Sequence, residues 1–342
     1  MKALVVTLTL ALAPVPGLAQ DFATGLVAYD RGDYAEALRE WEPLAERGDA
    51  EAQNRLGEMY EFGDGVAYDA SVAMHWYRLA ADQGDPSGQF NLGWMYESGH
   101  GVAQDYAEAA RWYHMSAEQG HATGQASLGQ LYDRGQGVAQ DFEEAIRWYR
   151  LAAEQKHALA QTSLGHLYRH GLGVVQDYAE ALRWYRLAAA QNYGEAQSNL
   201  GVMYTNGWGV AKDYVEAAKW HRLAAEQGDA AAQNNLGVLY DRGLGVPQDF
   251  TEAARWYRLA AGQGDAFAQN SLGGMYATGQ GVSQDYVTAH MWANISAANG
   301  NADAVVNRDS IADRMTAIDI AEAQKRAGLC MDSSYYSSSA CD

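Results

Sequence analysis

Cysteine is nearly absent from this sequence of 342 residues, which contains two, Cys330 and Cys341, both close to the C-terminus. Two cysteines exclude a fold built on several disulfides and a zinc site made of four thiolates. In an oxidising compartment we expect the pair to form a structural disulfide that closes the segment Met331–Ala340 into a small loop. Redox catalysis is the alternative, but the cysteines are separated more widely than those of a catalytic dithiol.

Basic residues are also scarce, because 24 Lys and Arg stand against 43 Asp and Glu, for a formal net charge of -19. Such a surface repels phosphate groups, so general binding to nucleic acid or to an anionic membrane is disfavoured. The sequence has few Phe (6) and Pro (5), but it has 36 Gly, 22 Tyr and 10 Trp. This skewed supply indicates that a few positions are filled repeatedly, and 48% hydrophobic residues exclude a disordered glycine-rich tract.

Long apolar runs are absent after the first twenty residues. The positively charged Met1-Lys2, the apolar run Ala3–Ala13 and the small residues Gly17-Leu18-Ala19 are typical of a signal peptide over residues 1–19. The run is shorter than the ~20 apolar residues that span a bilayer. We therefore expect cleavage before Gln20, a periplasmic or secreted protein, and no membrane insertion after cleavage. The alternative is a buried N-terminal helix.

The dominant feature that is present is a repeat of 36 residues. A Leu-Gly dipeptide returns at this step, beginning at Leu56, Leu92, Leu128, Leu164, Leu200, Leu236 and Leu272. A tryptophan returns at Trp76, Trp112, Trp148, Trp184, Trp220, Trp256 and Trp292. Seven full units therefore occupy residues 49–84, 85–120, 121–156, 157–192, 193–228, 229–264 and 265–300. Residues 20–48 form a shortened leading unit.

Each unit predicts two helices. In residues 85–99, Leu92, Met95 and Tyr96 fall on one helical face, and Asp85 is placed to cap the start. The second helix opens at Asp105, another capping residue. A lone helix pair cannot bury such a face, whereas stacked pairs can. The sequence therefore predicts an all-α fold, an α-solenoid of antiparallel helix pairs in one continuous array.

The residues after the seventh unit leave the repeat pattern. Ile311, Met315 and Ile318 have the spacing of one helix, which we expect to cover the last unit, as solenoids require. Capping helices are therefore predicted over residues 301–327, followed by a tail over residues 328–342 that contains both cysteines.

The repeated pattern A-x-x-Q-x-x-L-G-x-[ML]-Y-x-x-G-x-G-V-x-x-D-[YF]-x-E-A-x-x-W-Y-R-x-A-A-x-Q-G resembles the Sel-one-like repeat (SLR), a relative of the tetratricopeptide repeat, over about residues 22–327. The resemblance implies a right-handed superhelix that acts as a protein-binding scaffold, and bacterial members are often exported. Four residues depart from the repeated pattern. Lys156 and Asn192 replace a glycine, and His221 and Ala293 replace the tyrosine after the repeated tryptophan. We expect local looseness there, not a different fold.

Comparison of the seven units separates constant from variable positions. The positions of Glu51, Arg55, Glu58 and Phe62 vary and lie on one face of the first helix, opposite the constant Leu-Gly face. In successive units the position of Glu58 holds Glu58, Trp94, Gln130, His166, Val202, Val238 and Gly274. The position of Phe62 holds Phe62, Ser98, Arg134, His170, Asn206, Arg242 and Thr278. We expect this stripe to line a concave surface and bind a protein or peptide; the alternative is that its residues are merely solvated.

Certain residues stand out as partner-binding candidates. Trp94 and Trp208 lie outside the repeated tryptophan position, and tryptophan is enriched in binding hot spots, although Trp208 could instead pack on an adjacent unit. His166 and His170 have the i, i+4 spacing of metal ligands, but no third ligand is near, so a polar or pH-sensitive contact is expected. The full set is Phe62, Trp94, Arg134, His166, His170, Trp208, Arg242 and Phe267.

Motifs for catalysis, nucleotide binding and metal binding are not recognised in the sequence. We therefore expect a monomeric, non-enzymatic adaptor without cofactor or metal. The alternative is an envelope protein that recognises peptidoglycan or penicillin and has weak β-lactamase-type activity. A cysteine-rich branch of the resembled family has that association, but its Cys pair in each repeat is missing here. A secreted factor acting on a host partner is a third possibility.

Overall fold

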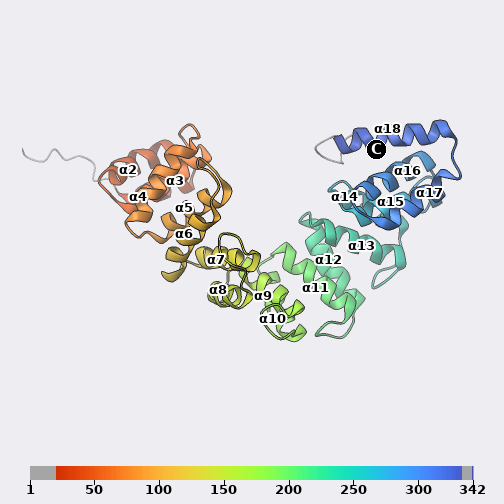
Figure 1. Ribbon diagram of the computed structural model, residues 1–342, viewed down its shortest axis with the longest axis horizontal. Helices are drawn as coiled ribbons and strands as arrows, with labels where there is room; N and C mark the ends of the chain where they lie inside the picture. Colours follow the sequence, from red (N-terminus) through yellow and green to blue (C-terminus); the bar gives the residue numbers. More distant parts are fainter. Residues whose placement is uncertain (1–20, 333–340, 342) are drawn as a thin grey trace, which may run out of the picture. The chain divides into compact units, whose positions relative to one another are not determined.

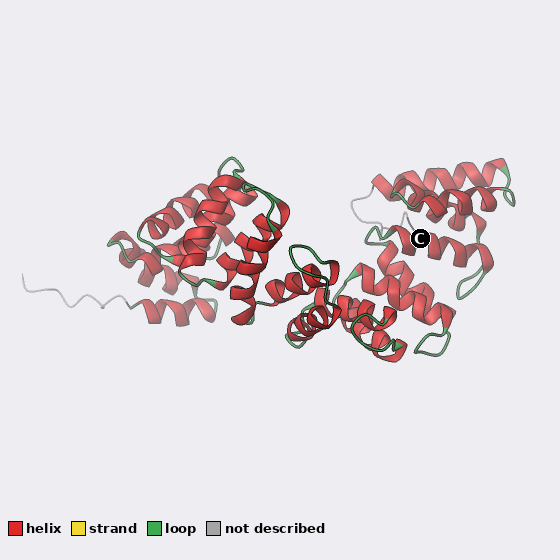
Figure 2. Cartoon of the chain, turned by 60° about the horizontal axis from the view of Figure 1, so that its bottom comes forward, coloured by secondary structure: helices red, strands yellow, loops and turns green. Residues whose placement is uncertain are grey.

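The computed structural model describes residues 21–332 and Cys341, and within these residues it contains helices and no strand (Figure 2). The predicted signal peptide, residues 1–19, lies outside the described residues. None of the described helices combines the length and the apolar character that crossing a membrane requires. The all-α prediction is confirmed.

The chain divides into two compact units, of which the first ends at Gln140 and the second begins at Asp141 (Figure 1). The first contains α1 (Phe22–Asp30), α2 (Tyr34–Glu46), α3 (Ala50–Phe62), α4 (Ala70–Asp82), α5 (Pro86–Ser98), α6 (Tyr106–Glu118) and α7 (Ala122–Arg134). The second contains α8 (Phe142–Glu154), α9 (Ala158–His170), α10 (Tyr178–Ala189), α11 (Gly194–Asn206), α12 (Tyr214–Glu226), α13 (Ala230–Arg242), α14 (Phe250–Ala261), α15 (Ala266–Thr278), α16 (Tyr286–Ala298), α17 (Ala302–Ala312) and α18 (Ala317–Asp332). This division differs from the single continuous array that the repeat predicts. In a repeat array only neighbours touch, so no element ties distant repeats together.

Each repeat supplies a first helix, helix A, and a second helix, helix B. Helices A are α3, α5, α7, α9, α11, α13 and α15, and helices B are α4, α6, α8, α10, α12, α14 and α16. Within each compact unit, helix A packs on helix B of its own repeat and on the helix B before it. Small residues at the contacts let the backbones approach. Ala232, at a position that holds only alanine or glycine, and Ala253, at a position that is alanine in all seven repeats, are fully buried.

Capping residues begin and end these helices as the sequence predicts. The Asp85 carboxylate accepts a 2.6 Å hydrogen bond from the Gly88 amide, and Asp105 caps α6 through two amides. Helix A ends at a left-handed glycine, such as Gly99 with φ of 74°. Lys156 and Asn192 adopt φ of 68° and 61°, so they keep the left-handed turn that glycine makes elsewhere. The expected looseness at these two sites is therefore replaced by a turn of the same form.

The C-terminal helix prediction needs correction, because two helices replace one. Ile311 lies in α17 and Ile318 in α18, and the helical structure is interrupted between these two helices. Thr316 and Asp319 cap the start of α18 reciprocally, each side chain accepting a hydrogen bond from the backbone amide of the other. The Ile318 side chain is 81% exposed, whereas Ala323 and Ala327 are buried in the core that α18 forms with α16. Helix α18 also continues beyond residue 327 to Asp332.

Candidate recognition surface

The variable stripe lies on the side of helix A that faces away from the packed core. Every residue at the position of Phe62 is exposed in the seven repeats, and none at the position of Glu58 is buried. In α9, for example, His166 and His170 are exposed, whereas Ala160 and Leu164 are fully buried. We name the residues at the positions of Glu51, Arg55, Glu58 and Phe62 in all repeats the helix A face.

The two unusual tryptophans have different environments. Trp94 is half-buried on α5 and stacks on His100, with ring centroids 5.3 Å apart. Trp208 stacks face to face on Tyr178 of the preceding repeat at 5.5 Å, and the Arg169 guanidinium lies 5.7 Å from its ring. Trp208 therefore packs between repeats, which is the alternative that the sequence left open, while one part of its surface stays accessible.

His166 and His170 lie side by side at the end of α9, with ring centroids 4.4 Å apart. The Arg169 guanidinium donates a 3.0 Å hydrogen bond to Nε2 of His170 and a 3.1 Å bond to Asn199. Partial desolvation and the charge of Arg169 lower the pKa of both histidines. Both effects favour the neutral form of the pair, and Nε2 of His170 already accepts a hydrogen bond from Arg169. Among the described residues, no three His, Cys, Asp or Glu side chains gather as a metal site.

The remaining candidates are exposed and divided between the two compact units. Phe62 is 66% exposed and Phe267 67% exposed, unusually high fractions for phenylalanine. Arg134 and Arg242 are also exposed. Phe62, Trp94 and Arg134 belong to the first unit and the other five candidates to the second. The candidates therefore form two sets on repeated helices.

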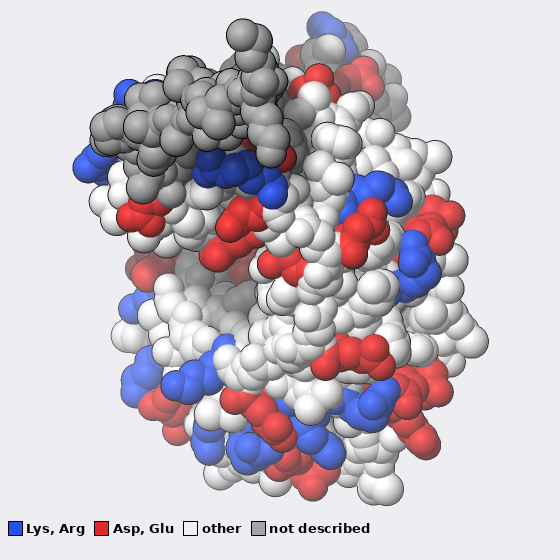
Figure 3. Space-filling model, turned by 90° about the vertical axis from the view of Figure 1, so that its left-hand side faces the viewer, with Lys and Arg blue, Asp and Glu red and all other residues white. Residues whose placement is uncertain are grey.

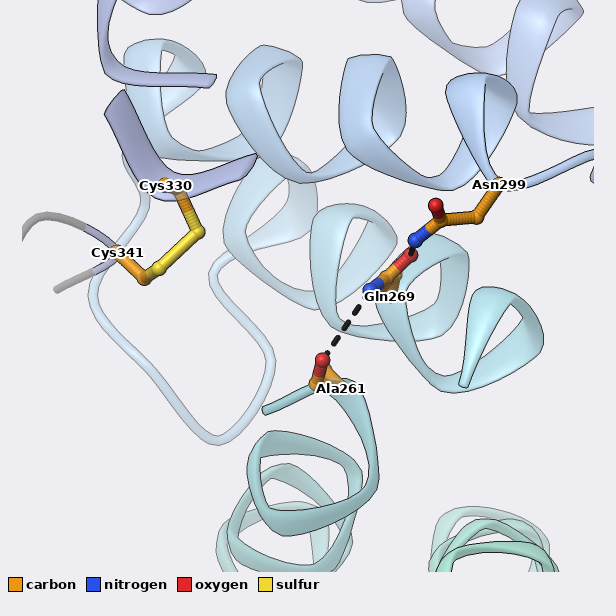
Figure 4. The surroundings of a disulfide bond; sticks show 5 residues. All are labelled: Ala261, Gln269, Asn299, Cys330 and Cys341. Atoms are coloured by element: carbon orange, nitrogen blue, oxygen red, sulfur yellow. Dashed lines mark hydrogen bonds between the residues drawn. A yellow bond between two sulfur atoms is a disulfide. The ribbon is translucent and has the colours of Figure 1, made fainter. Parts of the chain in front are cut away.

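A buried glutamine on helix A, the Q of the repeated pattern, joins successive repeats. In Figure 4, Gln269 donates a 3.1 Å hydrogen bond to the Ala261 carbonyl of the preceding helix B, while Asn299 donates a 3.0 Å bond to Gln269 Oε1. The same carbonyl contact recurs at Gln53, Gln89, Gln125, Gln161 and Gln233. The glutamine amide is thus a second donor to a carbonyl in the last turn of helix B, which also accepts a backbone amide of the following turn, as the Ala261 carbonyl does from Gly264.

A second recurrent pair joins helix B back to helix A. The Tyr113 hydroxyl donates a 2.5 Å hydrogen bond to Glu97, and Tyr77 makes the same contact to Glu61. Burial raises the pKa of Glu61 despite this bond. The tyrosine rings also fill the space beside the helix A glycines, such as Gly93. His221, which replaces this tyrosine, is buried against Gly201.

Charged side chains on helix B pair within their own helix. Glu108–Arg111 and Glu180–Arg183 approach to 2.9 and 2.5 Å. The Arg183 guanidinium also lies 4.0 Å from the centroid of the Trp184 ring. Acidic and basic groups are interspersed on the face drawn in Figure 3. Many carboxylates are therefore helix caps or ion-pair partners.

The two cysteines form a disulfide at the C-terminal end (Figure 4). Cys330 stands in the last turn of α18, its Cα atom lies 5.1 Å from that of Cys341, and both residues are buried. They belong to the apolar core that contains Met291 and Trp292 of α16. The bond therefore ties Cys341 to the end of α18, and both cysteines pack in the core that α18 shares with the last repeat.

Helix pairs of one repeated form, stacked through the same buried residues, define an α-solenoid. The Sel1 repeat family matches at residues 50–85, 86–121, 122–157, 158–193, 194–229, 230–265 and 266–301, one residue later than the units drawn from the sequence. The chain therefore belongs to the Sel1 repeat family, whose members generally mediate protein–protein interaction as scaffolds and are typically not enzymes.

Solved structures similar to this chain include two Sel1-type proteins. A Sel1 repeat protein from Oxalobacter formigenes is 34% identical, with a TM-score of 0.65 over 71% of this chain and 96% of that one. The protein c5321, described as a protective antigen of uropathogenic Escherichia coli strains with an SLR fold, is 31% identical. Its match covers 91% of this chain and 83% of that one, with a TM-score of 0.45. A comparison with curated proteins finds no match.

Proposed function

We propose that this protein is an exported, non-enzymatic scaffold that binds a protein or peptide partner on the helix A face. The observation that carries the proposal is the contrast within one helix. The positions that hold the repeats together are constant and buried, and the positions opposite them vary and are accessible. A frame that repeats seven times thus presents a different side chain at each step, which suits recognition of one particular partner.

The aromatic and basic residues on this face support a protein partner. Trp94 and Phe62 offer apolar area on helices that are already ordered, so little entropy is lost when a partner covers them. Arg134 and Arg242 add positive charge to a chain whose net charge is -19. A peptide with apolar and acidic groups complements these features.

Photo-crosslinking in the producing cell tests which face binds. The crosslinking amino acid p-benzoylphenylalanine is placed at Phe62, Arg134 or His170 on the helix A face. Matched controls carry it at Leu187 or Leu223 on helix B, which are 42% and 43% exposed. The proposal predicts one defined crosslinked partner from the helix A positions and none from the controls. Crosslinks that arise from helix B alone would show that the other surface binds.

Export and the absence of catalysis are tested separately. We expect the mature protein, recovered from the periplasm or the medium, to begin at Gln20 and to elute as a monomer. A chromogenic β-lactam assay on this material distinguishes the scaffold from a penicillin-recognising protein. Neither turnover nor a covalent acyl adduct is expected, and either one would contradict the non-enzymatic proposal.

A further inference from the structure

Two repeats replace both members of the tyrosine–carboxylate pair at once. The repeats that keep tyrosine after tryptophan have a charged residue at the position of Glu61, namely Glu61, Glu97, Asp133, Arg169 and Asp241. The repeat with His221 has Thr205 at that position, and the repeat with Ala293 has Ala277. In both cases a large buried side chain and its charged neighbour become smaller together. The tyrosine and its charged neighbour are thus both absent from the repeat with His221 and from the repeat with Ala293.

The repeat with His221 has a cavity at this place. The cavity has a volume of about 250 Å³ and opens on the helix A face between α11 and α13. Its walls include Val202, Val238 and Leu239, and Thr205 lies beside His221. The histidine is 1% exposed, and its Nδ1 has no hydrogen-bond partner among the described residues. A buried polar side chain without a partner is unusual, and here it lines an accessible cavity.

The repeat with Ala293 has a cavity at the equivalent place. It has a volume of about 220 Å³ and lies between α15 and α17. Its eight lining residues stand two repeats after eight of those around the first cavity: Gly274, Ala277, Thr278, Tyr286, Asn307, Ser310, Ile311 and Arg314 correspond to Val202, Thr205, Asn206, Tyr214, Asn235, Val238, Leu239 and Arg242. Both cavities lie within the second compact unit. The structure therefore repeats one kind of site.

The walls of the two cavities define the group that fits them. Each has one charged residue, Arg242 or Arg314, and the side chains of these arginines have no ion-pair or hydrogen-bond partner in the described part of the chain. An asparagine, Asn235 or Asn307, stands at the same place in each wall. Since a cavity of ~150 Å³ already accepts benzene, each one has room for a substituted aromatic ring. Free guanidinium groups at the wall favour an adjacent carboxylate.

We propose that each cavity binds an aromatic side chain of a peptide, with a neighbouring carboxylate on Arg242 or Arg314. In the repeats that keep tyrosine, the corresponding place holds the tyrosine and its charged neighbour, which His221 and Thr205, or Ala293 and Ala277, replace with smaller side chains. This assignment rests on the proposed function, because it names the chemistry that part of the helix A face recognises. It predicts a partner segment with aromatic residues next to acidic groups.

The isolated protein and a small probe test the assignment without the natural partner. The probe is N-acetyl-4-fluoro-L-phenylalanine, which joins one ring to one carboxylate, and its carboxamide is the uncharged control. Binding is followed by the amide NMR signals of Val202, Val238, Gly274 and Ser310. We expect saturable shifts at both cavities and affinity for the carboxylate at least about tenfold higher than for the carboxamide. Equal affinities would overturn the role of the arginines.

Filling the cavities supplies the matched variants. His221→Tyr restores the residue found in five other repeats, so it should fold, and it should abolish the shifts at Val202 and Val238 while those at Gly274 and Ser310 remain. Ala293→Tyr should give the reverse result. If His221→Tyr lowers the melting temperature, Val238→Phe blocks the first cavity from its wall instead. Undiminished binding by a folded, filled variant would overturn the proposal.

Failure of this proposal and failure of the proposed function give different results. If the wild-type protein shows no shifts at either cavity, the aromatic sites are refuted, whereas crosslinks from Phe62 or Arg134 in the first unit would still support the scaffold. If the probe binds but no helix A position crosslinks to a protein, the aromatic-binding cavities are supported and the proposed scaffold function is refuted. Arg242→Gln is the last variant. It should lower the affinity of the first cavity for the carboxylate probe and leave its affinity for the carboxamide probe unchanged.

Discussion

The side-chain amide of Gln263 donates a 2.8 Å hydrogen bond to Oε1 of Gln233, which in turn donates to the Ala225 carbonyl. These contacts connect α12, α13 and the turn after α14 through one buried glutamine. Gln233 is 4% exposed, so water cannot replace its bonds without entering the core. The repeat is therefore held together by polar as well as apolar contacts.

Replacing this glutamine should destabilise the array although the volume is kept. Gln233→Met removes two hydrogen bonds, one to the Ala225 carbonyl, which keeps its bond from the Gly228 amide, and one from the Gln263 amide, so we expect a loss of about 1–3 kcal/mol in the free energy of unfolding. Gln130→Met, which changes a half-buried glutamine on the helix A face, is the control and should change stability by less than about 0.5 kcal/mol. Urea unfolding followed by circular dichroism measures both, and equal stabilities would refute the role of the buried amide.

The repeated tryptophan should matter more than the unusual one. Trp148 is 4% exposed and lies under the Arg147 guanidinium at 4.4 Å, so Trp148→Ala should cost about 3–5 kcal/mol. Trp94→Ala removes a half-buried ring and should cost clearly less. Thermal melting of the two variants gives the comparison. An unchanged melting profile for Trp148→Ala would contradict its place in the core.

Acid should weaken the second unit through His221. Burial lowers the pKa of His221 from 6.5 to about 4, so between these values the unfolded chain binds more protons than the folded one. Neutral His221 therefore contributes fully to the free energy of unfolding above pH 6.5. As the pH falls towards 4 this free energy should decrease by roughly 2–3 kcal/mol. Unfolding at pH 7 and pH 4.5 measures it. His221→Tyr should lack this dependence, and parallel profiles for the two proteins would disprove it.

Reduction of the disulfide should loosen the capping helix. Cys330 and Cys341 are 11 residues apart, and closing a loop of this length stabilises the fold by about 3 kcal/mol in the chain-entropy description. A variant with both cysteines changed to Ala should therefore exchange its α18 amide hydrogens faster, because α18 packs on α16 beside the disulfide. Hydrogen exchange in α9, far along the sequence, is the control. Equal exchange in α18 would show that packing alone holds it.

Much of this fold is readable from the sequence because the repeat presents each packing position seven times. Leu236 and Ala253 recur at constant spacing, and both are fully buried. The interruption between α17 and α18 was not predicted, because Ile311 and Ile318 have the spacing of one helical face. The interruption depends on the polar cap that Thr316 and Asp319 form at the start of α18, and the spacing of apolar residues does not reveal a polar cap.

The site was only partly predictable. The exposure of the helix A face follows from its period, but the partner of Gln233 lies thirty residues away, and spacing alone does not identify a bond across repeats. The cavity beside His221 does not follow from variation at single positions, because it depends on two changes at once, at His221 and at Thr205.

Crosslinking from the helix A face is the measurement that tests the scaffold most directly. With p-benzoylphenylalanine at Phe62, Arg134 or His170, we expect the same partner to be captured from each position, and no partner from Leu187 or Leu223. Capture from the two helix B positions without capture from helix A would contradict the account.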